Sequence, residues 1–406
     1  PQNIDKAENR HKFSSLCDSL GVSQPQWAEV ANEKEVLKFA KKTGYPVLVR
    51  PSYVLSGSAM NVAFNPRDLK DYLKKATSLS KEYPVVISKF ILNAREIEID
   101  AVASKGELFT FQISEHVENA GIHSGDATLV TPPQRTYYET VRKIKEITKK
   151  LAKALEISGP FNIQFIAKNN EIKVIECNLR ASRSFPFISK VTGKNFAFLA
   201  TKAIMGHKIT EKNSLAELEI VGIKAPQFSF GRLKGADPTS GVEMVSTGEV
   251  GCIGSDFDDA FLKAVIATGM TIPKQNIVVS VSGDENRFKL LNELRLLHEK
   301  YNFFCTDDTY KFFRFHNIKC KLIHKLDEKA KPNLYTQLKN KKIDLVVNLP
   351  NPLKQINLDK NYDLRRATID FNVPLITNLQ VAKAFLDAIH TKKIEDLEIK
   401  AWQEYF

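Results

Sequence analysis

Cysteine is scarce in this 406-residue sequence, which holds five residues of this type without a Cys-x-x-Cys pair. That spacing argues against a disulfide framework and favours reduced thiols. No apolar run approaches the length of a membrane-spanning helix. Internal repeats and low-complexity stretches are absent, which excludes repeat architectures. The opening residues PQNIDKAENRHKF lack signal-peptide character and enter a helix at once, so we expect a part of a longer protein.

The charge balance is positive but dispersed. Lys and Arg total 59 against 47 Asp and Glu, a formal net charge of +12. The basic residues are spread along helical faces such as KIKEITKKLAKAL, where Glu interrupts them. This pattern favours a solvated cationic surface with sites for anionic metabolites over a nucleic-acid-binding stripe.

The pattern of predicted elements changes near residues 268–276. Before this point, helices at 10–20, 33–43 and 66–79 accompany β-prone runs, and successive strands from residue 84 onward predict an antiparallel sheet. A long helix at 136–155 follows. After Gly269 strands and helices alternate regularly, which predicts a doubly wound α/β domain with a parallel sheet.

One predicted hairpin carries oxygen ligands. The runs 161–167 and 171–177 are strand-like, and Lys-Asn-Asn between them is turn chemistry. Alternation along the second strand puts Glu176, Asn178 and Arg180 on one side, where Gln164 of the first strand can join them. A carboxylate and two amide oxygens suit Mg²⁺ or Mn²⁺ holding nucleotide phosphates. A polar outer face of an ordinary hairpin remains the alternative.

Further candidates lie on loops and strand ends. Arg10 and Arg50 bracket the SGS loop in a predicted triphosphate cradle, although Arg50 alone would read as a strand-end charge. The backbone near Ile91 could meet an adenine edge and Glu96 ribose hydroxyls, with an exposed strand face as the alternative. The stretch 115–126 is predicted to be a functional loop, because two histidines, three acids and two glycines crowd into it. Zinc binding there lacks any HExxH or cysteine spacing.

Four segments carry a resemblance that spans the chain. RPSYVLSGSAM, EHVENAGIHSGDATL, GPFNIQF and IECNLRASRSFPFISK resemble the carboxy-terminal synthetase half of carbamoyl-phosphate synthetases, and the last third resembles their methylglyoxal-synthase-like regulatory domain. The resemblance implies a mixed α/β and α+β chain: an ATP-grasp domain over 1–272, without its leading nucleotide-fold subdomain, and an allosteric domain over 273–406. The ATP-grasp part would have a small lobe at about 20–90 and a large lobe at about 91–260.

The resemblance also implies roles for individual residues. It assigns catalysis to Arg180, Arg50, Arg10 and His123, and metal ligation to Gln164, Glu176 and Asn178. It assigns ATP contacts to Arg10, Arg50, Gly57, Lys89, Ile91, Glu96, Gly121, Ile122, His123, Ser124, Gln164 and Glu176. The implied cofactors are ATP and two Mg²⁺ or Mn²⁺ ions, with K⁺ as a further candidate. The implied activity is a ligase step, ATP-dependent phosphorylation of carbamate, for which a fragment alone would not suffice.

The regulatory part of the resemblance leaves more open. It implies effector contacts at Thr306, Thr309, Asn348, Asn351 and Asn361, and a second effector site at Glu118, Asp126 and Glu243. LSGSAM and ECNLRASRSFPF resemble the animal, ammonia-dependent urea-cycle type, with N-acetylglutamate as activator and a mitochondrial matrix location. Against that type, His324 replaces a tryptophan. Ser58 replaces the arginine of bacterial relatives.

Other functions stay open beside this one. The first alternative is a glutamine-dependent synthetase of pyrimidine or arginine synthesis, regulated by nucleotides and cytoplasmic. A second is a decayed module that only senses an effector. The expected partners are carbamate, carbamoyl phosphate, an N-acetylglutamate or nucleotide effector, and the amino-terminal half with its glutaminase-like region, but neither nucleic acid nor membrane.

Overall fold

The computed structural model describes residues 1–30, 32–51, 60–79, 85–209, 218–326, 328, 330–350 and 361–406. The chain forms two compact units, which are described separately. Unit 1 comprises Pro1–Lys224, Gly241–Met244 and Lys400–Phe406, and unit 2 comprises Ala225–Ser240 and Val245–Ile399. The predicted domain boundary after residue 272 stays a prediction. Among the described residues, no helix combines the length and apolar character that a membrane span needs.

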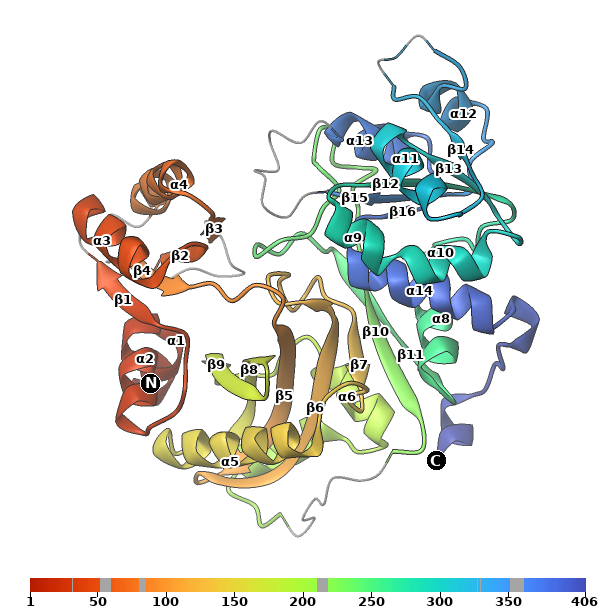
Figure 1. The fold of residues 1–406 in the computed structure, drawn as a ribbon. Helices are drawn as coiled ribbons and strands as arrows, with labels where there is room; N and C mark the ends of the chain where they lie inside the picture. The colour runs from red at the N-terminus through yellow and green to blue at the C-terminus, as the bar shows by residue number, and fades with distance from the viewer. Residues whose placement is uncertain are drawn as a thin grey trace. The chain divides into compact units, whose positions relative to one another are not determined.

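Unit 1 contains a small antiparallel sheet in the order β1-β4-β2-β3 (Figure 1). Its strands are β1 (Trp27–Val30), β2 (Val47–Pro51), β3 (Asn61–Ala63) and β4 (Val85–Lys89). Helices α3 (Glu33–Thr43) and α4 (Pro66–Leu79) have the predicted bounds. The Asn32 side chain accepts from Glu35 N–H to start α3, and Gly44, at φ 75°, ends it. Val36, Val49 and Leu69 join the core beneath them.

The larger sheet runs in the order β11-β10-β7-β6-β5-β8-β9. Its strands are β5 (Arg95–Ser104), β6 (Glu107–Asn119), β7 (Leu129–Thr131), β8 (Gly159–Lys168), β9 (Glu171–Asn178), β10 (Val221–Gln227) and β11 (Gly248–Gly254). The helices of this part of the chain are α1 (Gln2–Glu8), α2 (Arg10–Ser19), α5 (Tyr138–Ala154), α6 (Phe185–Thr192) and α7 (Phe196–Ile204). Ile97 and Ile99 of β5 join Phe13 of α2 and Ile144 of α5 in one core. Alternation therefore leaves the even-numbered, polar residues of β5 on the opposite face.

The predicted hairpin is confirmed in β8 and β9. Asn169 and Asn170 form its turn with φ of 52° and 63°, the left-handed pair that suits the twist of a tight hairpin. The register pairs Gln164 with Glu176 and then shifts to pair Phe165 with Val174. This shift leaves Ile175 as an extra residue beside the candidate ligands.

The predicted loop at 115–126 is wrong in its first part, because β6 continues to Asn119. The charged residues there are buried with partners, which makes strand structure tolerable. Glu115 is fully buried and accepts from the backbone N–H and Nε of Arg135 at 3.0 and 2.7 Å. His116 lies 3.9 Å from Glu98 as a buried ion pair. The connector proper is therefore shorter than expected.

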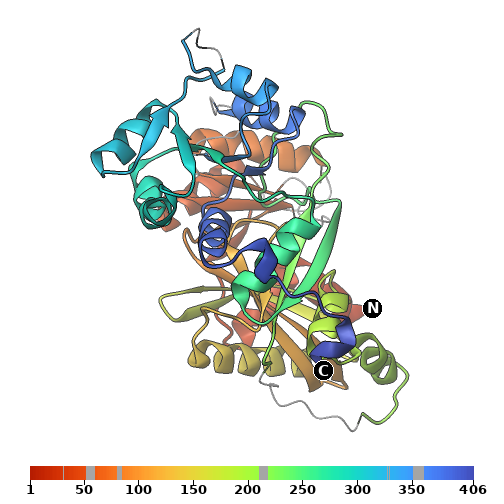
Figure 2. The ribbon, with the colours of Figure 1, turned by 90° about the vertical axis from the view of Figure 1, so that its right-hand side faces the viewer.

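Unit 2 is built on a parallel sheet in the order β14-β13-β12-β15-β16, as the alternating pattern predicted. Its strands are β12 (Asn276–Val281), β13 (Asn302–Cys305), β14 (Cys320–Leu322), β15 (Leu345–Leu349) and β16 (Leu375–Ile376). Its helices are α8 (Phe257–Ala267), α9 (Asp284–Lys289), α10 (Leu291–Leu297), α11 (Asp307–Phe315), α12 (Leu334–Lys339), α13 (Tyr362–Asp370), α14 (Leu379–Thr391) and the 3₁₀ turn η2 (Ile394–Asp396). Helices lie on both faces of the sheet (Figures 1 and 2). The last turn, η3 (Trp402–Tyr405), belongs to unit 1.

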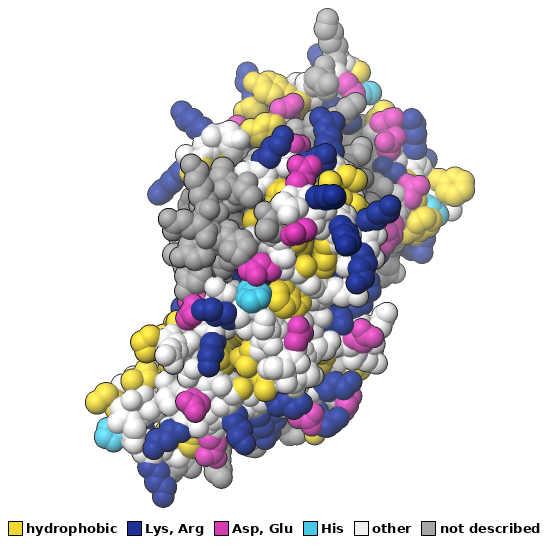
Figure 3. Space-filling model, turned by 90° about the vertical axis from the view of Figure 1, so that its left-hand side faces the viewer, with side chains coloured by type: hydrophobic (Ala, Val, Ile, Leu, Met, Phe, Trp, Pro, Cys, Tyr) yellow, Lys and Arg dark blue, Asp and Glu magenta, His cyan; other side chains and the backbone are white. Residues whose placement is uncertain are grey.

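The surface bears on the nucleic-acid alternative. On the face drawn in Figure 3, Lys and Arg side chains are scattered among Asp and Glu side chains and do not merge into one basic stripe. Helix α5 shows the same mixture, since Arg142 pairs with Glu139 and Glu146 at 2.7 and 2.6 Å. This face therefore favours a solvated charged surface, as the sequence pattern indicated.

Candidate functional site

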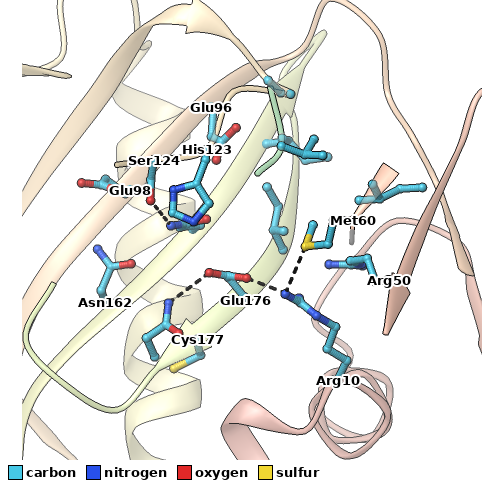
Figure 4. Close-up of a pocket in the computed structure, with 18 of the residues that line it drawn as sticks. Arg10, Arg50, Met60, Glu96, Glu98, His123, Ser124, Asn162, Glu176 and Cys177 are labelled. Carbon is cyan, nitrogen blue, oxygen red and sulfur yellow. Dashed lines mark hydrogen bonds and ion pairs between the residues drawn. The ribbon is translucent and has the colours of Figure 1, made fainter. Parts of the chain in front are cut away.

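A cavity of about 750 Å³ opens in unit 1 over the polar face of strands β5, β8 and β9. Figure 4 shows how Arg10 from α2, Arg50 from the small sheet and Glu176 from β9 converge on it. Its lining includes eleven of the predicted ATP contacts: Arg10, Arg50, Lys89, Ile91, Glu96, Gly121, Ile122, His123, Ser124, Gln164 and Glu176. Asn178 and Arg180 also line it, while Gly57 lies outside the described residues.

Strand register explains why the oxygen ligands meet. Glu98, Gln164 and Glu176 stand in one row across β5, β8 and β9. Asp100, Asn162 and Asn178 form the next row. Asn178 donates through Nδ2 to Glu176 at 3.1 Å, and Gln164 donates through Nε2 to Ser124 at 2.9 Å. Both amide nitrogens are thus engaged, which orients the amide oxygens as the atoms that would meet a divalent cation.

Two guanidinium groups supply positive charge beside this oxygen cluster. Arg10 Nη1 lies 3.3 Å from Glu176 Oε2. Arg50 is buried and donates through Nη2 to Ser88 at 3.2 Å, while its Nε has no hydrogen-bond partner among the described residues. Burial, with Arg10 nearby, lowers the pKa of Arg50 to about 9. A desolvated guanidinium of this kind is favourable for an anionic ligand that enters the cavity.

His123 is held by backbone contacts on both sides. The backbone N–H of His123 donates to Gly241 O at 2.7 Å, and its ring Nδ1 accepts from the backbone N–H of Gly125 at 3.0 Å. Burial lowers the pKa of His123, so the ring is neutral at pH 7 and carries its proton on Nε2. A neutral ring with a fixed Nε2–H can donate to a phosphate oxygen in the cavity.

The hinge residues differ from one another. Lys89 donates through Nζ to Gly44 O and Tyr45 O, both at 2.9 Å, so its ammonium joins the end of β4 to the segment just before β2. Ile91 lines the cavity. Glu96 is buried, and burial raises its pKa to about 7. The exposed strand face that the alternation of Glu96 and Glu98 allowed is therefore wrong.

The candidates for regulatory sites are placed less uniformly. Glu118 is buried on β6 and accepts from Thr128 N–H and Oγ1 at 2.8 and 3.0 Å. Asp126 is also buried, whereas Glu243 is exposed. These three residues do not share one environment.

The effector candidates of unit 2 gather at the carboxyl end of its sheet. Thr306 donates through Oγ1 to Ser280 Oγ at 3.0 Å, and Asn348 donates through Nδ2 to Ser280 O at 3.3 Å. Thr309 Oγ1 accepts from Val281 N–H at 3.0 Å. Asn361 is half-buried at the start of α13, and Asn351 lies outside the described residues. The topology thus brings three of the five predicted residues together.

Several lining residues had no predicted role: Met60, Glu98, Asn162, Ser182, Arg183, Ser184, Val242 and Met244. Strand alternation could have found two of them. Asn162 precedes Gln164 by two residues on β8, and Glu98 follows Glu96 by two on β5, so both share the face of the predicted ligands. Val242 and Met244 come from a distant segment, for which no local signal exists.

Comparison with known protein families identifies the family of this chain. The family model described as carbamoyl-phosphate synthase L chain, ATP binding domain, matches residues 9–212. The chain belongs to this family. A second model, the MGS-like domain, matches residues 289–377. The predicted carbamoyl-phosphate synthetase resemblance is confirmed at this level.

Relatives of the carbamoyl-phosphate synthase chain are long proteins. "Multifunctional protein URA2" of Saccharomyces cerevisiae is 51% identical over 403 residues, which are 96% of this chain and 18% of that protein. "Carbamoyl-phosphate synthase [ammonia], mitochondrial" of Homo sapiens is 43% identical over 417 residues, covering 100% of this chain and 28% of that protein. The chain therefore spans less than a third of either relative. The predicted animal ammonia type is not specifically supported.

Solved structures confirm the predicted ATP-grasp fold. The biotin carboxylase domain of Hydrogenobacter thermophilus 2-oxoglutarate carboxylase superposes with a TM-score of 0.56 at 15% identity, covering 64% of this chain and 65% of that one. Biotin carboxylase from Campylobacter jejuni gives 0.53 at 18% identity, covering 65% and 66%. At such identities the likeness concerns the fold.

Proposed function

We propose that the chain is the carboxy-terminal part of a carbamoyl-phosphate synthetase, a ligase that phosphorylates carbamate with ATP to give carbamoyl phosphate and ADP. The observation that carries the proposal is the cavity in which Glu176, Gln164 and Asn178 meet Arg10 and Arg50. In this step a carbamate oxygen forms a bond to the γ-phosphorus, the bond from that phosphorus to the β,γ-bridging oxygen breaks, and ADP leaves with the electron pair.

The residues act by position and charge. Arg50 and Arg10 would hold the phosphates, and Arg180 would meet the transferring phosphoryl group, whose negative charge guanidinium groups stabilise. His123, neutral with its proton on Nε2, would donate to a phosphate oxygen without adding charge. Glu96 and the backbone at Ile91 would contact the nucleoside, while Lys89 supports the hinge through its two carbonyl contacts.

The ligand set fits divalent ions. A carboxylate with two amide oxygens is a hard-oxygen set. Burial raises the pKa of Glu176, but Arg10 and the hydrogen bond from Asn178 lower it by more, so the carboxylate stays ionised. We propose two Mg²⁺ ions at Gln164, Glu176 and Asn178. They would neutralise phosphate charge when bound. Mn²⁺ in their place and K⁺ as a further ion remain predictions.

We infer that the chain comes from the glutamine-dependent, nucleotide-regulated type of synthetase and not from the urea-cycle type. The support is the ranking of relatives, since the yeast and Squalus acanthias multifunctional proteins reach 51% and 45% identity and the human ammonia enzyme 43%. The human relative is named mitochondrial, and the more similar yeast one is not, so we also infer a cytoplasmic location. The partners would be the amino-terminal synthetase half and its glutaminase-like region.

The decisive experiment is the reverse half-reaction in the full-length protein. ATP formation from ADP and carbamoyl phosphate should be measured for wild type, Glu176→Ala and the exposed control Glu139→Ala. We expect Glu176→Ala to lower the rate by about 10³-fold, because the central ligand is lost, and the control to match wild type. A folded wild-type protein without this activity would support the decayed effector-sensing module instead.

A second experiment addresses the regulatory type. Uridine nucleotide and N-acetylglutamate should each be titrated into the full-length enzyme while carbamoyl-phosphate synthesis is followed. The inferred type predicts a response to the nucleotide and none to N-acetylglutamate. The opposite result would restore the urea-cycle type and its mitochondrial location.

A further inference from the structure

The link between β9 and α6 carries Arg180 but does not fix its side chain. Arg180 is exposed, two residues beyond the end of β9. Among the described residues its guanidinium has one hydrogen bond, a 3.5 Å contact with the carbonyl of the neighbouring Ala181. The location of Arg180 over the cavity therefore depends on how the backbone of residues 179–184 is held.

Two buried carboxylates of β5 hold this link. Ser182 donates through Oγ to Asp100 Oδ1 at 2.5 Å, and Ser184 donates through Oγ to Glu98 Oε1 at 2.8 Å. Glu98 and Asp100 are each 1% exposed. The acids alternate on one strand face, and the serines have the same spacing in the link. The result is a two-point attachment between a rigid central strand and the segment that follows Arg180.

Asp100 also ties the link to the ligand row. The same Oδ1 accepts from Asn162 Nδ2 at 3.0 Å, and Asn162 pairs in register with Asn178. One carboxylate oxygen thus connects Ser182, on the Arg180 link, with a residue beside a proposed metal ligand. A displacement of the link relative to the ligand row would break one of these two bonds.

The arrangement is costly as a purely structural device. Burial raises the pKa of Asp100 to about 7, and its Oδ2 has no hydrogen-bond partner among the described residues. Burial also raises the pKa of Glu98, but His116 and then Lys224, itself 1% exposed, lower it by more. Buried charges contribute little to stability compared with apolar residues of similar volume, whereas they can fix one arrangement among several. Here the fixed arrangement is that of the Arg180 link.

We propose that Asp100 and Glu98 are positioning residues for Arg180, acting through Ser182 and Ser184. The assignment rests on the proposed function, in which Arg180 meets the transferring phosphoryl group. A guanidinium that must stabilise this group loses most of its effect when it is misplaced by about 1 Å, a displacement that can cost on the order of 100-fold in rate.

The test uses the full-length protein and the reverse half-reaction. Ser182→Ala removes one attachment with little change in volume and leaves the acids in place. We expect it to lower kcat for ATP formation by about 10- to 100-fold and to leave the KM for ADP within about twofold, because the nucleotide contacts lie elsewhere. Ser182→Thr, which keeps the hydroxyl, should restore most of the rate. Ser189→Ala, a serine on α6 bonded to Phe185 O, is the matched control.

A double-mutant comparison separates positioning from general damage. In an Arg180→Ala background, Ser182→Ala should lower kcat by less than about twofold, since the residue that it positions is gone. An equal loss in both backgrounds, or no loss in the single variant, would overturn the assignment while leaving the proposed function intact. A wild-type protein without ATP formation would overturn both.

Discussion

The two groups of predicted ligand-binding residues differ in how their polar atoms are used. In unit 1 the predicted residues surround a cavity of about 750 Å³, and Arg50 keeps a buried Nε without a hydrogen-bond partner among the described residues. In unit 2 three of the predicted effector residues, Thr306, Thr309 and Asn348, bond to the sheet itself. Thr309 and Asn348 are 1% and 0% exposed, and Asn348 Oδ1 accepts from Arg365 Nη1 at 3.1 Å.

This difference indicates what each site must do to bind a ligand. The proposed nucleotide site presents groups whose interactions a phosphate would complete, so binding would add hydrogen bonds to a largely formed site. An effector that contacts Asn348 or Thr309 must replace bonds that already exist. If the proposed effector role holds, binding in unit 2 would be coupled to a local rearrangement that begins at Arg365, which joins Asn348 to Asp237.

The largest expected effect on stability is at Arg365. This side chain is fully buried and bonds Asp237 through Nε and Nη2 at 2.7 and 2.5 Å. Arg365→Met should lower the free energy of unfolding by about 3 kcal/mol, because Asp237, whose side chain is only 13% exposed, would lose its buried partner. Chemical denaturation would measure this. Arg142→Met should leave stability nearly unchanged, because the ion pairs of Arg142 with Glu139 and Glu146 are exposed. Equal changes in the two variants would contradict the contrast.

The corresponding change in unit 1 should affect activity and not stability. Arg50→Met removes a buried guanidinium whose Nη2 donates to Ser88 within the described part of the chain. We expect ATP formation from ADP and carbamoyl phosphate to fall by about 10²- to 10³-fold, with an unchanged or higher melting temperature since a desolvated charge is removed. Kinetics and thermal unfolding on the same sample would check both. A loss of stability with normal kinetics would show that Arg50, like Arg365, serves the stability of the fold and not the reaction.

A smaller effect is expected at Thr306. Thr306→Val keeps the shape of the side chain and removes the hydroxyl that donates to Ser280. If this hydroxyl contacts the effector, the concentration for half-maximal response should rise by about 5- to 30-fold, the equivalent of one buried hydrogen bond. Calorimetric titration of the full-length protein with a uridine nucleotide is the measurement. An unchanged affinity would show that Thr306 serves only the sheet.

The sequence was sufficient for features that depend on local pattern. The hairpin at 161–177, the bounds of α3 and α4, and the alternating pattern of the last third follow from turn residues, caps and periodicity, which act over a few residues. The burial of several acidic residues could not be predicted from the sequence. In the sequence Glu98 and Asp100 look like exposed strand residues and Glu115 like a loop residue, because their partners Ser184, Ser182 and Arg135 lie 20 to 86 positions away. Pairing with distant residues makes the burial of these acids tolerable, and such pairing has no local signature in the sequence.

The smallest expected effect concerns Glu96. The pH dependence of stability would show whether its side chain is protonated in the folded protein. Burial raises its pKa from 4.5 to about 7, against an opposing contribution from His116 and reinforced by Glu98 and Glu176. The folded state thus holds a proton that the unfolded state releases, so this group makes stability fall as pH rises from about 4.5 to about 7. Glu96→Gln should remove this contribution and flatten the pH dependence of the unfolding free energy across that window. Denaturation at pH 5 and pH 7 would measure the slope, with Glu139→Gln as the exposed control. If the two variants give parallel slopes, Glu96 is ionised in the folded protein, and its carboxylate would then accept from a nucleoside hydroxyl without first losing a proton.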